Sequence, residues 1–326
     1  MKLLDFILYR ARRAAVIAPI LCASFYLLMF WLSDTYRMEV LPEYMSSREQ
    51  LVGLMLVLIL ISTFLVSFVI VAQRRSMRFG QELVDNHVLD ERPEDWLRPV
   101  RRRSILIGSG LGIFYGLALN TPLPWIIDFF EISGTARSTV IGQALLWTIV
   151  GVALSLRLST AYAFYKVGKT VDAKILDTSV YGPFARNGMD DVLAIVVLLV
   201  LSTVQALDAQ FRLGNYLATL LVALPAAAFL FLLPMFSIHH RIAEARDANL
   251  ERVEREIASM PTPQTAGDLQ KLEILLQHRD RVRDTLLWPI NRSVTSRLAV
   301  YVIIPPIAWL GAAFVEFGVG RIMNGP

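Results

Sequence analysis

The chain has 326 residues, of which 55% are hydrophobic and only 18% are charged. A soluble domain carries about a quarter charged residues, so this composition argues against a soluble globular protein. The single cysteine, Cys22, has no partner for a disulfide within the chain. The net charge is +4, and most Lys and Arg residues lie between the apolar blocks. This placement favours a role in orienting the chain in a membrane over nucleic-acid binding.

The apolar residues form seven blocks, most of them long enough to cross a bilayer, which takes about 20 residues per helix. The fifth block is short, and we expect it to extend into its flanks. The predicted spans are Ala14 to Leu32, Leu51 to Ala72, Ser104 to Ile127, Val140 to about Ala161, Val192 to Leu207, Tyr216 to Ile238, and Leu298 to Val319.

The segments that flank these spans are alternately rich and poor in Lys and Arg. The N-terminus and the second, fourth and sixth loops hold 27 of the 32 Lys and Arg residues, and the other segments hold 5. Cytoplasmic loops carry this excess. The pattern predicts a multi-pass protein of the bacterial plasma (inner) membrane, with its N-terminus in the cytoplasm and its C-terminus on the outer face.

The second loop, residues 73–103, has arginines clustered at both of its membrane ends. Positions of this kind suit anionic lipid headgroups, so we expect the lipid bilayer itself to be their partner. Nucleic-acid binding would need clustered aromatic residues or a known fold, and neither is present. The predicted headgroup residues are Arg74, Arg75, Arg78, Arg101, Arg102 and Arg103.

The third span carries three glycines on one face, Gly108, Gly112 and Gly116. Small residues at this spacing let two membrane helices approach closely. The neighbouring helix is either another helix of the same bundle or a helix of a second copy.

Charged residues are scarce inside the blocks. Arg157 lies roughly 26 Å along the helix axis from Val140, which places it near the cytoplasmic boundary in the predicted topology. We expect its side chain to reach the headgroup layer. Asp190 and Asp191 lie at the corresponding end of the fifth span.

The outer part of the third span and the seventh span contain helix-breaking residues. These are Asn120, Pro122 and Pro124 in the third span, and Pro305–Pro306 in the seventh. Broken membrane helices occur at transport sites. The alternative function is therefore a channel or transporter with a path near these two spans.

Two adjacent histidines, His239 and His240, mark the end of the sixth span. Ligands on one helix share a face at a spacing of three or four residues, so a metal site is not expected here. An imidazole suits the headgroup layer. The sequence has no P-loop, HExxH, CxxC or GxSxG motif, and we assign no catalytic, cofactor-binding or metal-binding residue.

Residues 239–297 predict a cytosolic helical hairpin. Pro261 and Pro263 separate two charged helices that each carry an apolar stripe, and Thr265 with Asp268 has capping-box spacing. The second helix is apolar along more than one line, which indicates an interaction site. The predicted interface consists of Leu272, Leu275, Val282 and Leu286.

The fold class is thus all-α: a polytopic bundle of about seven transmembrane helices with a cytosolic antiparallel hairpin. Residues 1–238 form six spans with cytosolic loops 73–103 and 157–190, residues 239–297 the hairpin, and residues 298–326 the last span and a short outer tail. A segment from Leu232 to Glu316, with "LLPM…IHHRI", "LLWPINRSVTSR" and "VYVIIPPIAWLGAAFVE", resembles bacterial multi-spanning membrane proteins that are largely uncharacterised. The resemblance implies this architecture and no activity.

These observations favour a non-enzymatic membrane protein that acts in assembly, scaffolding or signalling. Its partner is expected to be another copy of the chain or a different protein, bound through the hairpin.

Overall fold

The computed structural model describes residues 13–35, 48–118, 121–172, 177–202, 213–288, 296–301, 303, 304, 307 and 311, with backbone alone at 48–50, 98–102 and 213–222. Within these residues the regular structure is entirely helical. In chain order the helices are α2 (Ala14–Leu32), α3 (Arg48–Asp85), α4 (Pro93–Ala118), α5 (Leu123–Ile127), α6 (Gly134–Gly168), the 3-10 helix η3 (Thr178–Tyr181), α7 (Gly182–Ser202), α8 (Leu213–Ser259) and α9 (Ala266–Arg283).

Four of the described helices are long and apolar enough to cross a membrane, which indicates a membrane protein. They are α2, the part of α3 from Leu51, α6, and the part of α8 from Ala223, and they coincide with the first, second, fourth and sixth predicted spans.

The other three predicted spans are described only in part. The apolar portion of α4, Arg103–Ala118, is shorter than a full crossing, and residues 119–120 of the third span lie outside the described residues. Helix α7 carries Arg186, Asp190 and Asp191 in its first half, and residues 203–207 of the fifth span are also outside. The same holds for most of the seventh span, including Pro305–Pro306.

Helices α2, α3 and α6 are joined through one buried tyrosine. Tyr26 and Phe30 of α2 pack with Leu58 of α3 and Leu146 of α6. The Tyr26 hydroxyl lies 2.9 Å from Ser62 Oγ and donates to the carbonyl of Gly142 at 3.1 Å. A buried hydroxyl needs such partners, so this tyrosine fixes both the spacing and the rotation of the three helices.

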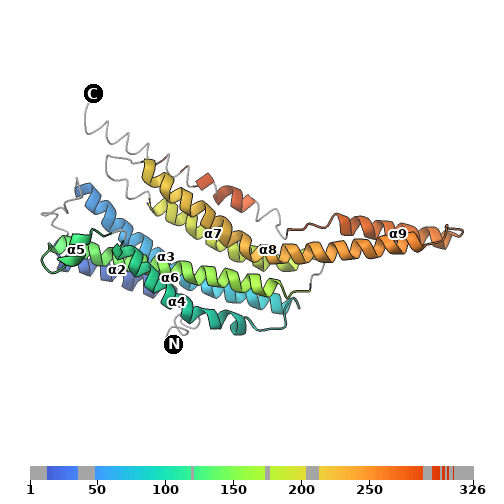
Figure 1. Ribbon diagram of the computed structural model, residues 1–326, viewed down its shortest axis with the longest axis horizontal. Helices are drawn as coiled ribbons and strands as arrows, with labels where there is room; N and C mark the ends of the chain where they lie inside the picture. Colours follow the sequence, from blue (N-terminus) through green and yellow to red (C-terminus); the bar gives the residue numbers. More distant parts are fainter. Residues whose placement is uncertain are drawn as a thin grey trace, which may run out of the picture.

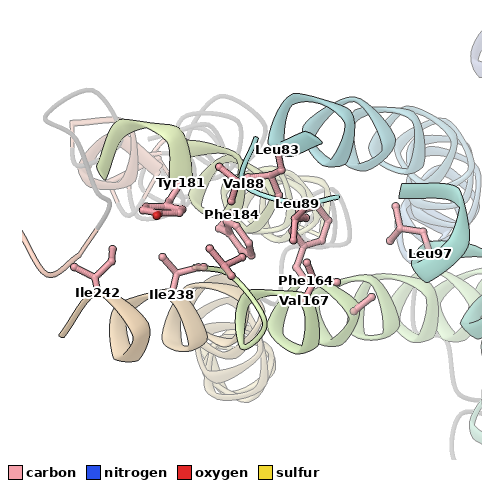
Figure 2. Close-up of a cluster of buried hydrophobic side chains, with 12 residues drawn as sticks. Leu83, Val88, Leu89, Leu97, Phe164, Val167, Tyr181, Phe184, Ile238 and Ile242 are labelled. Carbon is pink, nitrogen blue, oxygen red and sulfur yellow. The ribbon is translucent and has the colours of Figure 1, made fainter. Parts of the chain in front are cut away.

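The largest apolar cluster gathers segments from three predicted cytosolic loops at one end of the bundle (Figure 2). It combines the end of α3 and the turn after it, α4, the end of α6, the start of α7 and the middle of α8. The residues are Leu83, Val88, Leu89, Leu97, Ala163, Phe164, Val167, Val171, Tyr181, Phe184, Ile238 and Ile242. The second, fourth and sixth loops therefore meet on the same side.

The opposite end brings together the first and third predicted outer loops. Thr35 Oγ1 lies 2.9 Å from Ser138 Oγ, and a Cβ on Gly134 would lie 2.7 Å from the carbonyl oxygen of Ser33. The end of α2 is therefore level with the start of α6.

Helix α8 continues well beyond the bundle as a single helix of 47 residues, about 70 Å at 1.5 Å per residue. Helix α9 lies along its far part (Figure 1). The predicted capping box is confirmed, because the Thr265 side chain accepts from the Asp268 amide and the Asp268 carboxylate accepts from the Thr265 amide. We call residues 239–283 the arm.

Candidate functional site

A buried ion pair joins α6 to α7. Arg157 is only 3% exposed, and the Asp191 side chain is 1% exposed. The guanidinium engages both carboxylate oxygens: Nε donates to Oδ1, and Nη2 donates to Oδ2 at 3.1 Å. Bidentate geometry of this kind is the strong form of the arginine–carboxylate contact.

Neutral groups from α3 and α7 complete the surroundings of the guanidinium. Arg157 Nη1 donates to Ser76 Oγ at 3.0 Å, and Nη2 donates to Asn187 Oδ1 at 3.1 Å. Ser76 itself donates to Asn187 Oδ1 at 2.7 Å. Close by, Gln73 Nε2 donates to Thr160 Oγ1 at 3.2 Å.

These residues, Gln73, Ser76, Arg157, Thr160, Asn187 and Asp191, form what we call the polar lock. They connect α3, α6 and α7 in the protein interior, where a charge without a partner is costly. Within the described part of the chain, the Asn187 Nδ2 group is buried without a hydrogen-bond partner. The other polar groups described above have hydrogen-bond partners. We interpret the polar lock as a structural junction between the helices.

The expectation that Arg157 reaches the headgroup layer is wrong. Its side chain turns inward because Asp191 and Asn187 on α7 face it from across the bundle. The sequence held a usable signal, since Arg157 and Asp191 lie at the same predicted boundary of consecutive spans. The sequence alone does not give the rotation of each helix about its axis, so it does not predict that these two side chains face each other.

The second-loop arginines have varied surroundings. Arg75 Nη1 donates to Asp190 Oδ1 at 2.8 Å, with Arg75 half exposed. Arg74 is half-buried, whereas Arg78 and Arg103 are exposed. The side chains of Arg101 and Arg102 lie outside the described residues. Headgroup binding by these six arginines stays a prediction.

The glycine face of α4 packs against α6 of the same chain. A Cβ on Gly108 would lie 2.4 Å from the carbonyl oxygen of Gly151, and one on Gly112 would lie 2.2 Å from that of Trp147. At Gly116 the nearest atom is 3.1 Å away. The two backbones are in direct contact, so no solute fits between these helices at this crossing.

The predicted interface residues of the hairpin divide between two environments. Val282 is almost fully buried, and Leu272 and Leu275 are half-buried. Their spacing of three and seven residues puts them on one face of α9, and we infer that this face packs on α8. Leu286, beyond the end of α9, is exposed, as are Leu269 and Ile274 on other faces of the helix.

The histidine pair marks the base of the arm. The His239 ring stacks on Trp288 with centroids 4.2 Å apart, and its Nδ1 lies 3.2 Å from the Leu287 carbonyl oxygen. His240 Nε2 lies 3.2 Å from Glu244. Through these contacts, His239 of α8 holds the segment after α9, at Leu287 and Trp288, against α8. Among the described residues, no group of three or more His, Cys, Asp or Glu is placed to hold a metal ion.

Comparison of the chain with known protein families, with curated proteins and with solved structures finds no match.

Proposed function

We propose that the protein is a non-enzymatic integral membrane protein that acts through protein–protein interaction, with the arm as its binding surface. The observation that carries this proposal is the exposure of two large apolar side chains on the projecting α9: Leu269 and Ile274 are each 59% exposed. Both belong to α9, which lies along the part of α8 that projects from the bundle (Figure 1), and we expect this part to stand outside the lipid.

The way the arm is mounted supports a role in presenting a surface to a partner. Its base is held by the stacking of His239 on Trp288 and by Ile238 and Ile242 in the large apolar cluster. Trp288 also packs against the cluster that contains Phe231 and Met235. A rigid support lowers the entropy lost on binding.

The same proposal includes the membrane arrangement predicted from charge. It has seven crossings of a bacterial plasma membrane, with a cytoplasmic N-terminus and an external C-terminus. Support comes from the 27 Lys and Arg residues on one set of segments and from the meeting of three of those segments in one apolar cluster. The resemblance of residues 232–316 to uncharacterised bacterial membrane proteins is consistent with it.

A pair of matched variants tests the binding surface. Leu269→Glu with Ile274→Glu places two charges on the exposed apolar positions. As a matched control, Ala258→Glu with Ser259→Glu adds the same charge at exposed positions near the end of α8, on a different helix from the apolar pair. Polar positions of α9 next to Ile274 would not serve, because residues three or four apart share a face of the helix. Buried apolar contacts dominate protein interfaces, so only the first variant should change the size of the complex in detergent and its cross-linked products.

Equal helicity by circular dichroism controls for folding of the arm in both variants. If both variants keep the wild-type complex size and the wild-type cross-links, the arm is only a spacer and the proposed function is wrong.

A further inference from the structure

The segment between α4 and α6 exposes three large apolar side chains at the end of the molecule opposite the arm (Figure 1). Leu123 is 66% exposed, Ile127 is 71% exposed and Phe130 is 88% exposed. We call residues 121–133 the α5 segment. Exposed apolar groups this close together indicate contact with something other than water.

The three side chains form a single line. Their spacing of four and three residues is helical, and the turns continue beyond α5 because the Asp128 amide donates to the Pro124 carbonyl at 2.8 Å and the Ile132 amide to the Asp128 carbonyl at 3.1 Å. Asp128 and Glu131, both exposed, each follow one residue after a member of the line. The segment is therefore amphipathic, with an apolar line beside an acidic line.

The depth of the segment follows from the packing of α4 on α6. Gly116, near the end of α4, contacts α6 at Ala144, ten residues after α6 begins at Gly134. Ten helical residues rise about 15 Å, so α4 stops roughly that far below the start of α6. Thr121 Oγ1 donates to the Gly116 carbonyl at 2.9 Å, which holds the start of the α5 segment at the lower level.

The start of α6 is a useful marker of the membrane boundary. It is level with the end of α2, since Gly134 lies against Ser33, and α2 has 19 residues. That length is about 29 Å, close to the roughly 30 Å of a bilayer core. The α5 segment rises beside α6 from roughly the bilayer midplane to the boundary and thus spans most of one leaflet, with Asp128 and Glu131 in the outer half of that leaflet.

We infer that the α5 segment is a lipid-inserted anchor: Leu123, Ile127 and Phe130 contact acyl chains, while Asp128 and Glu131 face the headgroups and water. Leu111 and Phe114 of α4 are exposed as well, as expected for a helix surface that also contacts acyl chains. By its insertion, the α5 segment completes the third crossing, which α4 alone is too short to make. A second copy of the chain over the same line is the competing occupant.

Depth measurements on spin labels distinguish these occupants. In full-length protein with Cys22→Ser in phospholipid vesicles, a nitroxide is placed by Ile127→Cys or Phe130→Cys and, as matched controls, by Asp128→Cys or Glu131→Cys. Collision rates are measured with oxygen, which concentrates in acyl chains, and with a water-soluble nickel chelate. We expect the oxygen-to-nickel ratio to be several-fold higher at 127 and 130 than at 128 and 131.

Two results would overturn the inference. Labels at 127 and 130 that favour the nickel chelate, as the acidic positions do, would show that the line faces water. Labels protected from both reagents, with dipolar broadening that disappears on dilution with unlabelled protein, would show that a second copy covers it. A benzoylphenylalanine in place of Phe130 gives an independent readout, because lipid adducts support the anchor and protein adducts contradict it.

Discussion

Removing the buried carboxylate of Asp191 is expected to lower the free energy of unfolding far more than removing one charge from an exposed ion pair would. In Asp191→Ala the Arg157 guanidinium stays buried and loses the partner of its Nε group. Breaking one side of a buried pair costs about 3–5 kcal/mol. The nearby Arg75–Asp190 pair is a built-in comparison, because Arg75 is half exposed. Arg75→Gln should cost less than about 1 kcal/mol.

A double variant separates the value of the pair from the cost of leaving one charge alone. Replacing both members by apolar residues of similar size, Arg157→Met with Asp191→Leu, should cost less than Asp191→Ala alone, because no charge then remains buried. The assay is the free energy of unfolding in mixed detergent micelles, measured by tryptophan fluorescence and circular dichroism. If Asp191→Ala costs no more than Arg75→Gln, the polar lock does not hold the helices together. A double variant as costly as the summed single variants would also refute the reasoning.

Four further results are expected. Gly112→Ala should destabilise by about 1–3 kcal/mol or more, because the new Cβ would lie 2.2 Å from the Trp147 carbonyl oxygen. Gly110→Ala, with nothing within 4 Å, should be neutral or stabilise by up to about 1 kcal/mol, as unfolding in micelles will test. Thr265→Ala should speed hydrogen exchange of the first-turn amides of α9, since it removes the N-cap acceptor. The hydrogen bonds from Thr265 and Gln264 lower the pKa of Asp268, so its stabilising effect should persist above the ordinary aspartate value and be lost as pH falls through the lowered pKa. An equal effect of acid on wild type and Asp268→Asn would contradict this assignment.

Local chemistry explains which features of this fold are predictable from the sequence. The capping box at Thr265 depends on residues three apart, so it was visible without a structure. The four helices long enough to span were found because a bilayer sets their length and composition. The closeness of α4 to another helix followed from glycine spacing, although the sequence left two choices for that helix.

Features that depend on helix rotation were harder to predict. Arg157 was expected at the headgroups because the facing side chains of α7 come from a different helix, and periodicity does not fix how two helices face each other. The same problem affects α9, where Val282 was expected to bind an external partner. Val282 is buried, and we infer that it faces α8; Leu269, Ile274 and, beyond the end of α9, Leu286 are the exposed apolar positions.

The most direct test of the arm's role is site-specific photo-crosslinking in native membranes. A photoreactive amino acid is placed at Ile274 and, for comparison, at Ser259, which is exposed and polar on α8. If the arm binds a partner, position 274 should give a discrete protein adduct, either with a second copy or with one other protein. This adduct should disappear when Leu269→Glu is added. Failure of position 274 to give any protein adduct beyond that from position 259 would contradict a binding role for the arm.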